Sequence, residues 1–168
     1  GGARAAQFSA VLGLIGDTGT VTSAWGALNL IGGRPDVNVF SVQAADLAAA
    51  HTLRLRMPAG AAAVINVRGG APSMVNMGFQ LEGATAARTV YNFVDATQVT
   101  MSGIGLEGSV LAPHAAVAFS NGSMLGTLAA WQVSGDAELY HRPLRYQVDC
   151  AWWEVMRRRR IAAGNWPW

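Results

Sequence analysis

Hydrophobic and polar residues alternate along most of the chain, in short runs that end at turn-forming residues. Residues 37–42 read Val-Asn-Val-Phe-Ser-Val, and residues 53–57 read Leu-Arg-Leu-Arg-Met, which places Arg54 and Arg56 on one face of an extended segment. A period of two is typical of strands with one buried face. Further extended segments follow at residues 64–67, 74–81, 90–93 and 99–101. The pattern predicts an all-β fold built from short strands.

The most regular part of the pattern lies between residues 99 and 134. Residues 99–103 are followed eighteen residues later by a similar segment at 117–121, and residues 108–112 by one at 126–130. Two strand-like segments per period, at a constant offset, are typical of successive coils of a β-solenoid, in which neighbouring coils cover each other. A β-sandwich or barrel made of ordinary hairpins is the alternative that the pattern leaves open.

Both ends of the chain depart from this pattern. Residues 4–15 favour a short helix that the Gly-Asp-Thr-Gly turn at 16–19 ends, and the alanine-rich residues 44–50 favour one or two helical turns. Four of the six tryptophans and four consecutive arginines lie in the last 22 residues. We therefore divide the chain into an N-terminal segment (1–19), a domain resembling a β-helix (20–146) and a helical or irregular C-terminal tail (147–168).

Composition narrows the class of protein. About half of the residues are hydrophobic and 13% are charged, against roughly 25% charged in an average globular protein, which excludes intrinsic disorder. All twelve basic residues are arginine, and the net charge is only +2.

The lone Cys150 excludes an intramolecular disulfide and a cysteine-rich zinc site. No segment approaches the roughly 20 apolar residues of a membrane span. Because the chain starts without methionine, we interpret it as a piece of a longer precursor.

A string of short motifs in a fixed order runs through residues 88–143. It contains Gly-Ser-Val-Leu-Ala-Pro at 108–113, Asn-Gly at 121–122, Gly-Thr-Leu-Ala-Ala at 126–130 and Glu-Leu-Tyr-His-Arg-Pro at 138–143. Through these motifs the chain resembles the choice-of-anchor A domain family over roughly residues 20–145. The motif positions are Asn92, Gly108, Pro113, Asn121, Gly122, Gly126, Glu138, His141 and Pro143.

The resemblance implies a secreted bacterial domain with a right-handed β-helix like that of pectate lyases. It also implies an adhesive or structural role at the cell surface. The chain departs from the family pattern at His114, where the family has asparagine, and it lacks most of the family's portion before Trp25. We expect the missing portion to leave an open front end on the stack, unless another chain covers it.

Catalytic and metal-binding motifs are sparse. The triplet Asp-Thr-Gly at 17–19 matches that of aspartic proteases, but those enzymes need two such aspartates that share a proton, so we interpret it as a turn. No Gly-x-Ser-x-Gly elbow accompanies His51, His114 or His141. Glu138 and His141 have the spacing of metal ligands on a helix, but the local pattern is strand-like and no third ligand is near. We predict no catalytic site, no metal site and no cofactor.

The tail combines tryptophan with arginine, the two residue types that dominate interface hot spots. Four exposed tryptophans would make a monomer prone to aggregation, so we predict a partner-binding surface in the tail. Its residues are Trp152, Trp153, Arg157, Arg158, Arg159, Arg160, Trp166 and Trp168. Binding of the four arginines to nucleic acid or to an anionic surface is the weakest alternative.

Together these features predict a non-enzymatic module, secreted or at the cell surface, with a structural or adhesive role. We expect it to self-associate into a surface assembly or filament through its ends and its tail. The expected partners are further copies of the chain, other subunits of the assembly, or a glycan or other surface ligand, and not nucleic acid. A carbohydrate-active enzyme resembling a polysaccharide lyase is the main alternative, although Asp95 and Glu107 belong to no acidic cluster.

Overall fold

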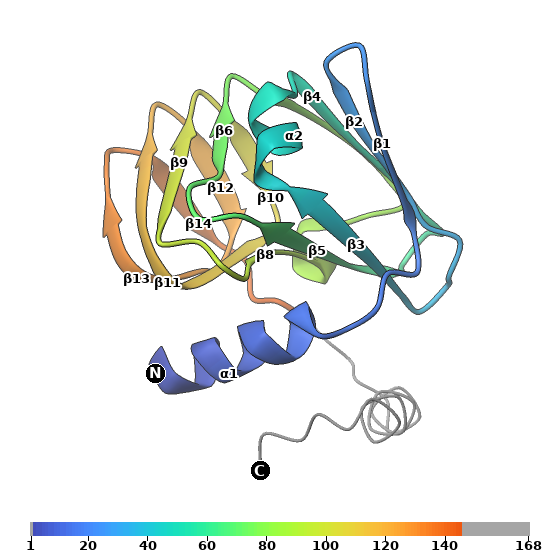
Figure 1. Cartoon of the computed structure of the whole chain (residues 1–168), viewed down its shortest axis with the longest axis horizontal. Coiled ribbons are helices and arrows are strands. Elements are labelled where there is room, and N and C mark those ends of the chain that lie inside the picture. Colours follow the sequence, from blue (N-terminus) through green and yellow to red (C-terminus); the bar gives the residue numbers. More distant parts are fainter. Residues whose placement is uncertain (1, 146–168) are drawn as a thin grey trace.

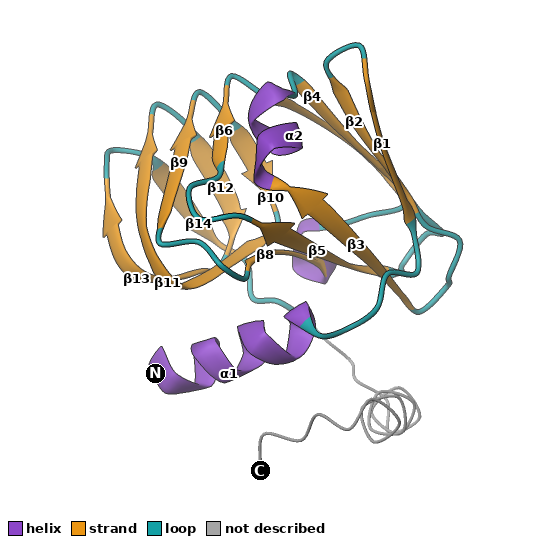
Figure 2. Ribbon diagram, viewed as in Figure 1, coloured by secondary structure: helices purple, strands orange, loops and turns teal. Residues whose placement is uncertain are grey.

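The computed structural model describes residues 2–145 of the chain (Figure 1). Strands dominate the described chain, and a helix lies along its outside (Figure 2). The helices are α1 (Gly2–Gly13), α2 (Ala44–Ala49) and the 3-10 turn η1 (Ala86–Arg88). The strands are β1 (Thr20–Ala24), β2 (Ala27–Ile31), β3 (Val37–Gln43), β4 (Thr52–Arg56), β5 (Ala62–Arg68), β6 (Ser73–Val75), β7 (Gly78–Glu82), β8 (Thr89–Phe93), β9 (Gln98–Ser102), β10 (Gly105–Glu107), β11 (Ser109–Ser120), β12 (Ser123–Gly126), β13 (Leu128–Ser134) and β14 (Glu138–His141).

The strands form three sheets in which almost every pairing is parallel. The first sheet has the order β1-β2-β4-β7, and the third sheet, β10-β12-β14, continues from it because β10 contacts β7. The second sheet has the order β3-β5-β8-β11-β9-β6, with β13 added to β11. Long strand β11 joins both arms of the second sheet, since residues 109–111 pair with β8 and residues 116–120 pair with β9. Pro113, which has no N–H to donate, lies in the register shift between these two parts.

The eighteen-residue offset corresponds to the register of the last coils. Val117 pairs with Val99 on β9, and Leu128 on β13 pairs with Val110 on β11. The all-β prediction is confirmed, and so is parallel stacking of the two segments at 99–103 and 117–121. An antiparallel sandwich does not account for this register. A closed, right-handed β-helix remains a prediction.

The core lies between the sheets and is built from ladders of apolar side chains. Leu30 on β2, Leu55 on β4 and Leu81 on β7 occupy one register position, and the first two are fully buried. Residues on either side of them, such as Arg54 and Arg56, point to the outside. Strict alternation therefore places one face of β4 in the core, as the sequence pattern predicts, whereas β5 and β8 are buried on both faces.

Helix α1 packs across the outside of the second sheet, along the lower side of the molecule in Figure 1. Leu12 is buried against Val64, Val90 and Leu111, which come from three neighbouring strands. A buried polar ladder holds the helix end. The side-chain amide of Asn66 donates to the carbonyl oxygen of Leu12 at 2.9 Å, which satisfies one of the carbonyls that a helix leaves free at its C-terminus.

The front of the stack, formed by β1 and β3, is partly covered. The backbone N–H groups of Thr18 and Gly19 donate to the carbonyl of Val39 on β3 at 3.0 and 3.1 Å, and α2 contacts β6. Antiparallel β1, a short strand with a mostly polar exposed side, ends the first sheet. The expectation of an open front end is therefore met in part, because the loop at residues 17–19 covers β3 whereas the outer edge of β1 has no partner strand among residues 2–145.

Candidate functional site

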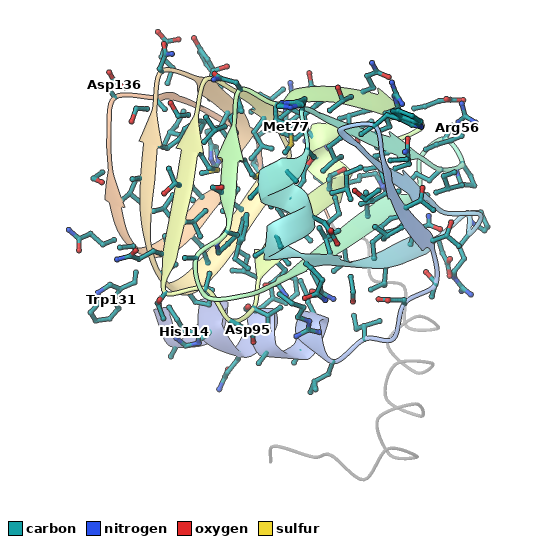
Figure 3. The ribbon with its side chains drawn as sticks, turned by 45° about the horizontal axis from the view of Figure 1, so that its top comes forward. Arg56, Met77, Asp95, His114, Trp131 and Asp136 are labelled. Carbon is teal, nitrogen blue, oxygen red and sulfur yellow. The ribbon has the colours of Figure 1, made fainter. Side chains whose placement is uncertain are left out.

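The last coil of the described chain, β13 and β14, forms an uncovered end, which we call the terminal coil. Strand β13 pairs only with β11 and β14 only with β12, so their outer edges have no partner strand among residues 2–145. Trp131 is 78% exposed and Val133 49% exposed, and Leu139 and Tyr140 are about half exposed. Trp131 lies at the outer end of the molecule, far from Arg56 (Figure 3). Unpaired edges beside apolar side chains favour association with another strand.

Polar contacts order the terminal coil. The backbone N–H of Asn121 donates to the carboxylate of Asp136 at 2.8 Å, and the hydroxyl of Tyr140 donates to Glu138. The bond to Glu138 raises the pKa of the Tyr140 hydroxyl above its ordinary value. Asn121 has a φ of 51°, a left-handed conformation that asparagine tolerates in turns. The Asn-Gly motif at 121–122 therefore forms the short connection between β11 and β12.

A second exposed surface, which we call the ladder face, lies on the outside of the first sheet. Arg54 Nε donates to Gln80 Oε1 at 3.0 Å, and Arg56 Nε donates to Glu82 Oε2 at 2.9 Å, in each case between β4 and β7. The ladder face consists of Asn29, Ile31, Arg54, Arg56, Gln80 and Glu82, which line a shallow hollow of about 580 Å³.

The β1–β2 turn exposes a further aromatic side chain. Trp25 is completely exposed and has a φ of 53°. Tight hairpin turns that need this conformation usually contain asparagine, aspartate or glycine, and a large apolar residue gains nothing there from packing. Trp25 is therefore a contact candidate outside the terminal coil.

The motif residues predicted from the sequence have structural positions that differ widely. Asn92 is buried beneath α1. The backbone at Gly126 lies against the backbone at Gly108, so a Cβ at Gly126 would clash with it. A Cβ at Gly122 would clash in the same way with the carbonyl of Ile104. Glu138 and His141 begin and end exposed β14, and Pro143 follows it in an exposed position. The structure thus brings most motif residues into the last coils, where they shape turns and close backbone contacts.

The histidines and acidic residues that the sequence analysis considered as possible catalytic groups or ligands do not form a metal cluster. His51 N–H donates to Gly26 O at the hairpin turn, His114 lies in the bend of β11, and His141 ends β14. Within residues 2–145, no group of three His, Cys, Asp or Glu side chains is arranged to hold a metal ion. Asp17 accepts a hydrogen bond from Ser41 at 2.7 Å, in keeping with a structural turn. The tail residues at 152–153, 157–160, 166 and 168, like Cys150, lie outside the described residues.

Sequence reasoning missed both exposed surfaces. The Leu-Arg-Leu-Arg alternation placed Arg54 and Arg56 together, but their partners Gln80 and Glu82 are 26 residues further along the chain. The terminal coil could have been recognised from Trp131 and Val133, which lie at the end of the second copy of the repeat with no third copy to follow.

The fold and these surfaces define a class: a domain of stacked parallel strands whose outer faces and last coil are available for contact. Residues 2–141 match the model of a family described as "Putative Ice-binding-like adhesive domain", and the chain belongs to that family. The match supports the adhesive surface role predicted from the sequence. Neither the curated proteins nor the solved structures give a match. None of the helices among residues 2–145 is long and apolar enough to cross a membrane.

Proposed function

We propose that this protein is a non-enzymatic adhesive module that associates with a second copy of itself through the terminal coil. The observation that carries the proposal is the contrast between the two ends of the stack. The outer edge of β1 at the front carries mostly polar side chains and a loop covers β3, whereas β13 and β14 at the back have exposed apolar side chains beside their unpaired edges. One adhesive end per chain favours a closed pair over an open filament.

The short strand β14 is suited to pairing with its own copy. In a two-fold antiparallel pair centred on Leu139, Leu139 faces Leu139 of the second copy, and Glu138 faces Tyr140. Such a pair joins two apolar side chains and places an acidic side chain opposite a phenolic hydroxyl that can donate to it. The interface is the same patch on both subunits, as a two-fold axis requires.

Several finer features belong to the same proposal. Resemblance to the choice-of-anchor A family supports secretion, display at the cell surface and a right-handed β-helix. The Trp/Arg tail would add contacts to the second copy. Neither a catalytic site nor a cofactor forms part of the proposed activity.

Light scattering of the full chain over a range of concentrations tests the self-association. We expect the mass of a pair, and we expect Val133→Lys to weaken the pair roughly tenfold or more, because it puts a charge on the free edge. Val75→Lys is the matched control, since Val75 is a similarly exposed valine (44%) on β6, away from the terminal coil. The control should leave the mass unchanged.

A monomer at all concentrations would overturn self-association, and filaments would overturn the closed pair. Equal effects of Val133→Lys and Val75→Lys would remove the terminal coil as the contact. Release of unsaturated sugars from a polyuronate would contradict the non-enzymatic part of the proposal and favour a polysaccharide lyase.

A further inference from the structure

The ladder face has two guanidinium groups held in fixed positions. Each arginine uses only its Nε–H in the hydrogen bond to its β7 partner, so the terminal nitrogens of Arg54 and Arg56 have no hydrogen-bond partner among residues 2–145. Both side chains leave the same face of β4, two residues and therefore about 7 Å apart along the strand. The bonds to Gln80 and Glu82 restrict their rotation, which lowers the entropy lost when a ligand binds.

Neighbouring positions add hydrogen-bonding groups and one apolar contact. In the register of the sheet, Asn29 lies beside Arg54 and Gln80 on its other side, and half-exposed Ile31 lies beside Arg56. The surface therefore presents guanidinium donors, amides that both donate and accept, and an aliphatic side chain. The shallow hollow between these side chains is open to solvent and large enough for part of a chain molecule.

This combination fits a polysaccharide that carries carboxylates. Guanidinium forks bind carboxylates in a bidentate manner, amides pair with sugar hydroxyls, and Ile31 can pack against the apolar side of a ring. An extended peptide would need a free sheet edge, but β4 lies inside the first sheet between β2 and β7. A phosphate polymer binds through many cationic contacts, and the carboxylate of Glu82 would repel its dense negative charge. We propose that the ladder face binds acidic polysaccharides through Arg54 and Arg56.

The proposed site deepens the adhesive role, because it names a ligand class, but it does not depend on self-association. Arg56 and Trp131 lie at opposite ends of the molecule (Figure 3). The two proposals can therefore fail separately. Loss of the pair in Val133→Lys should leave the affinity of each ladder face for polysaccharide unchanged, whereas variants of the ladder face should keep the mass of the pair.

Retention of the full chain on immobilised polygalacturonate tests the site, with neutral dextran, polyphosphate and duplex DNA as comparison surfaces. We expect retention on polygalacturonate and roughly tenfold or greater loss of affinity in the Arg54→Gln/Arg56→Gln double variant. The matched control is Arg4→Gln/Arg34→Gln, which removes the same charge. Arg4 is exposed on α1, and Arg34 forms an exposed ion pair with Asp36, a kind of contact that contributes little to stability.

Two further variants separate binding geometry from charge and from misfolding. Arg54→Lys/Arg56→Lys keeps the charge but loses the fork, and we expect it to lose most of the affinity. Glu82→Gln removes a negative charge beside Arg56 and should strengthen retention on polygalacturonate, a gain that an unfolded variant cannot produce. Equal loss in the ladder-face and control variants, retention on dextran, or stronger retention on polyphosphate or DNA would overturn the proposal.

Discussion

Replacing Gly126 by alanine is expected to lower the free energy of unfolding by about 3 kcal/mol, because the substitution overpacks a site enclosed by backbone. A Cβ at this position would lie 2.0 Å from the carbonyl oxygen of Gly108 and 2.6 Å from its carbonyl carbon. These atoms belong to the preceding coil and cannot rotate away as a side chain can. The last two coils must therefore separate, and the pairing between β11 and β13 weakens with them.

Thermal and urea unfolding measure this effect, with the melting temperature expected to fall by roughly 6–12 °C for a chain of this size. Gly33→Ala is the control, since Gly33 is exposed and a Cβ there would meet nothing within 4 Å. It should change the stability by about 0.5 kcal/mol or less. Similar stability of Gly126→Ala and the control would show that the coils do not stack as closely as the structure describes.

Asn92→Leu is expected to cost about 3 kcal/mol, because it breaks a completely buried polar network. The Asn92 side-chain amide donates to the carbonyl of Ser9 at 2.9 Å and to Asn66 Oδ1 at 2.8 Å. Its own oxygen accepts a hydrogen bond from the Ser9 hydroxyl at 2.6 Å. Leucine has a similar size but no polar atoms, so three buried groups on Ser9 and Asn66 lose their partner.

Urea unfolding of Asn92→Leu, Ser9→Ala and the double variant checks this prediction. The two single changes should be strongly coupled, because both remove the same hydrogen bond between α1 and the second sheet. Asn29→Leu serves as the control at a half-exposed asparagine on β2, with an expected change of about 0.5 kcal/mol or less. Additive effects of Asn92→Leu and Ser9→Ala would argue that α1 is not held by this ladder.

Two regular features of the molecule could be predicted from the sequence. Alternation in β4 separated Leu53 and Leu55 from Arg54 and Arg56, and the structure buries the leucines and exposes the arginines. The offset between residues 99–103 and 117–121 is the register of β9 and β11. Both features repeat in the sequence itself, so no distant contact had to be known.

The front of the molecule could not be predicted in the same way. Its coils are longer, since β4 pairs with β2 and β7 at offsets of 25 and 26 residues, and α2 and η1 interrupt the chain between strands. The Asp-Thr-Gly triplet, which the sequence predicts as a turn, lies in the loop between α1 and β1. The same segment also covers the edge of β3. This depends on the hydrogen bond from the Thr18 N–H to the Val39 carbonyl, which no local pattern indicates.

The sequence by itself determined that the protein is all-β, which face of the alternating strand β4 is buried, and how the last coils are paired. Period-two alternation and a repeated offset are properties of neighbouring residues, and backbone geometry converts them directly into strands. Only the tertiary structure decided that a loop covers the edge of β3, that the terminal coil exposes apolar side chains, that Asn92 is buried under α1, and that Arg54 and Arg56 are aligned by β7. These outcomes depend on hydrogen bonds between residues 21 to 83 positions apart, and the order in which coils stack cannot be inferred from any single segment.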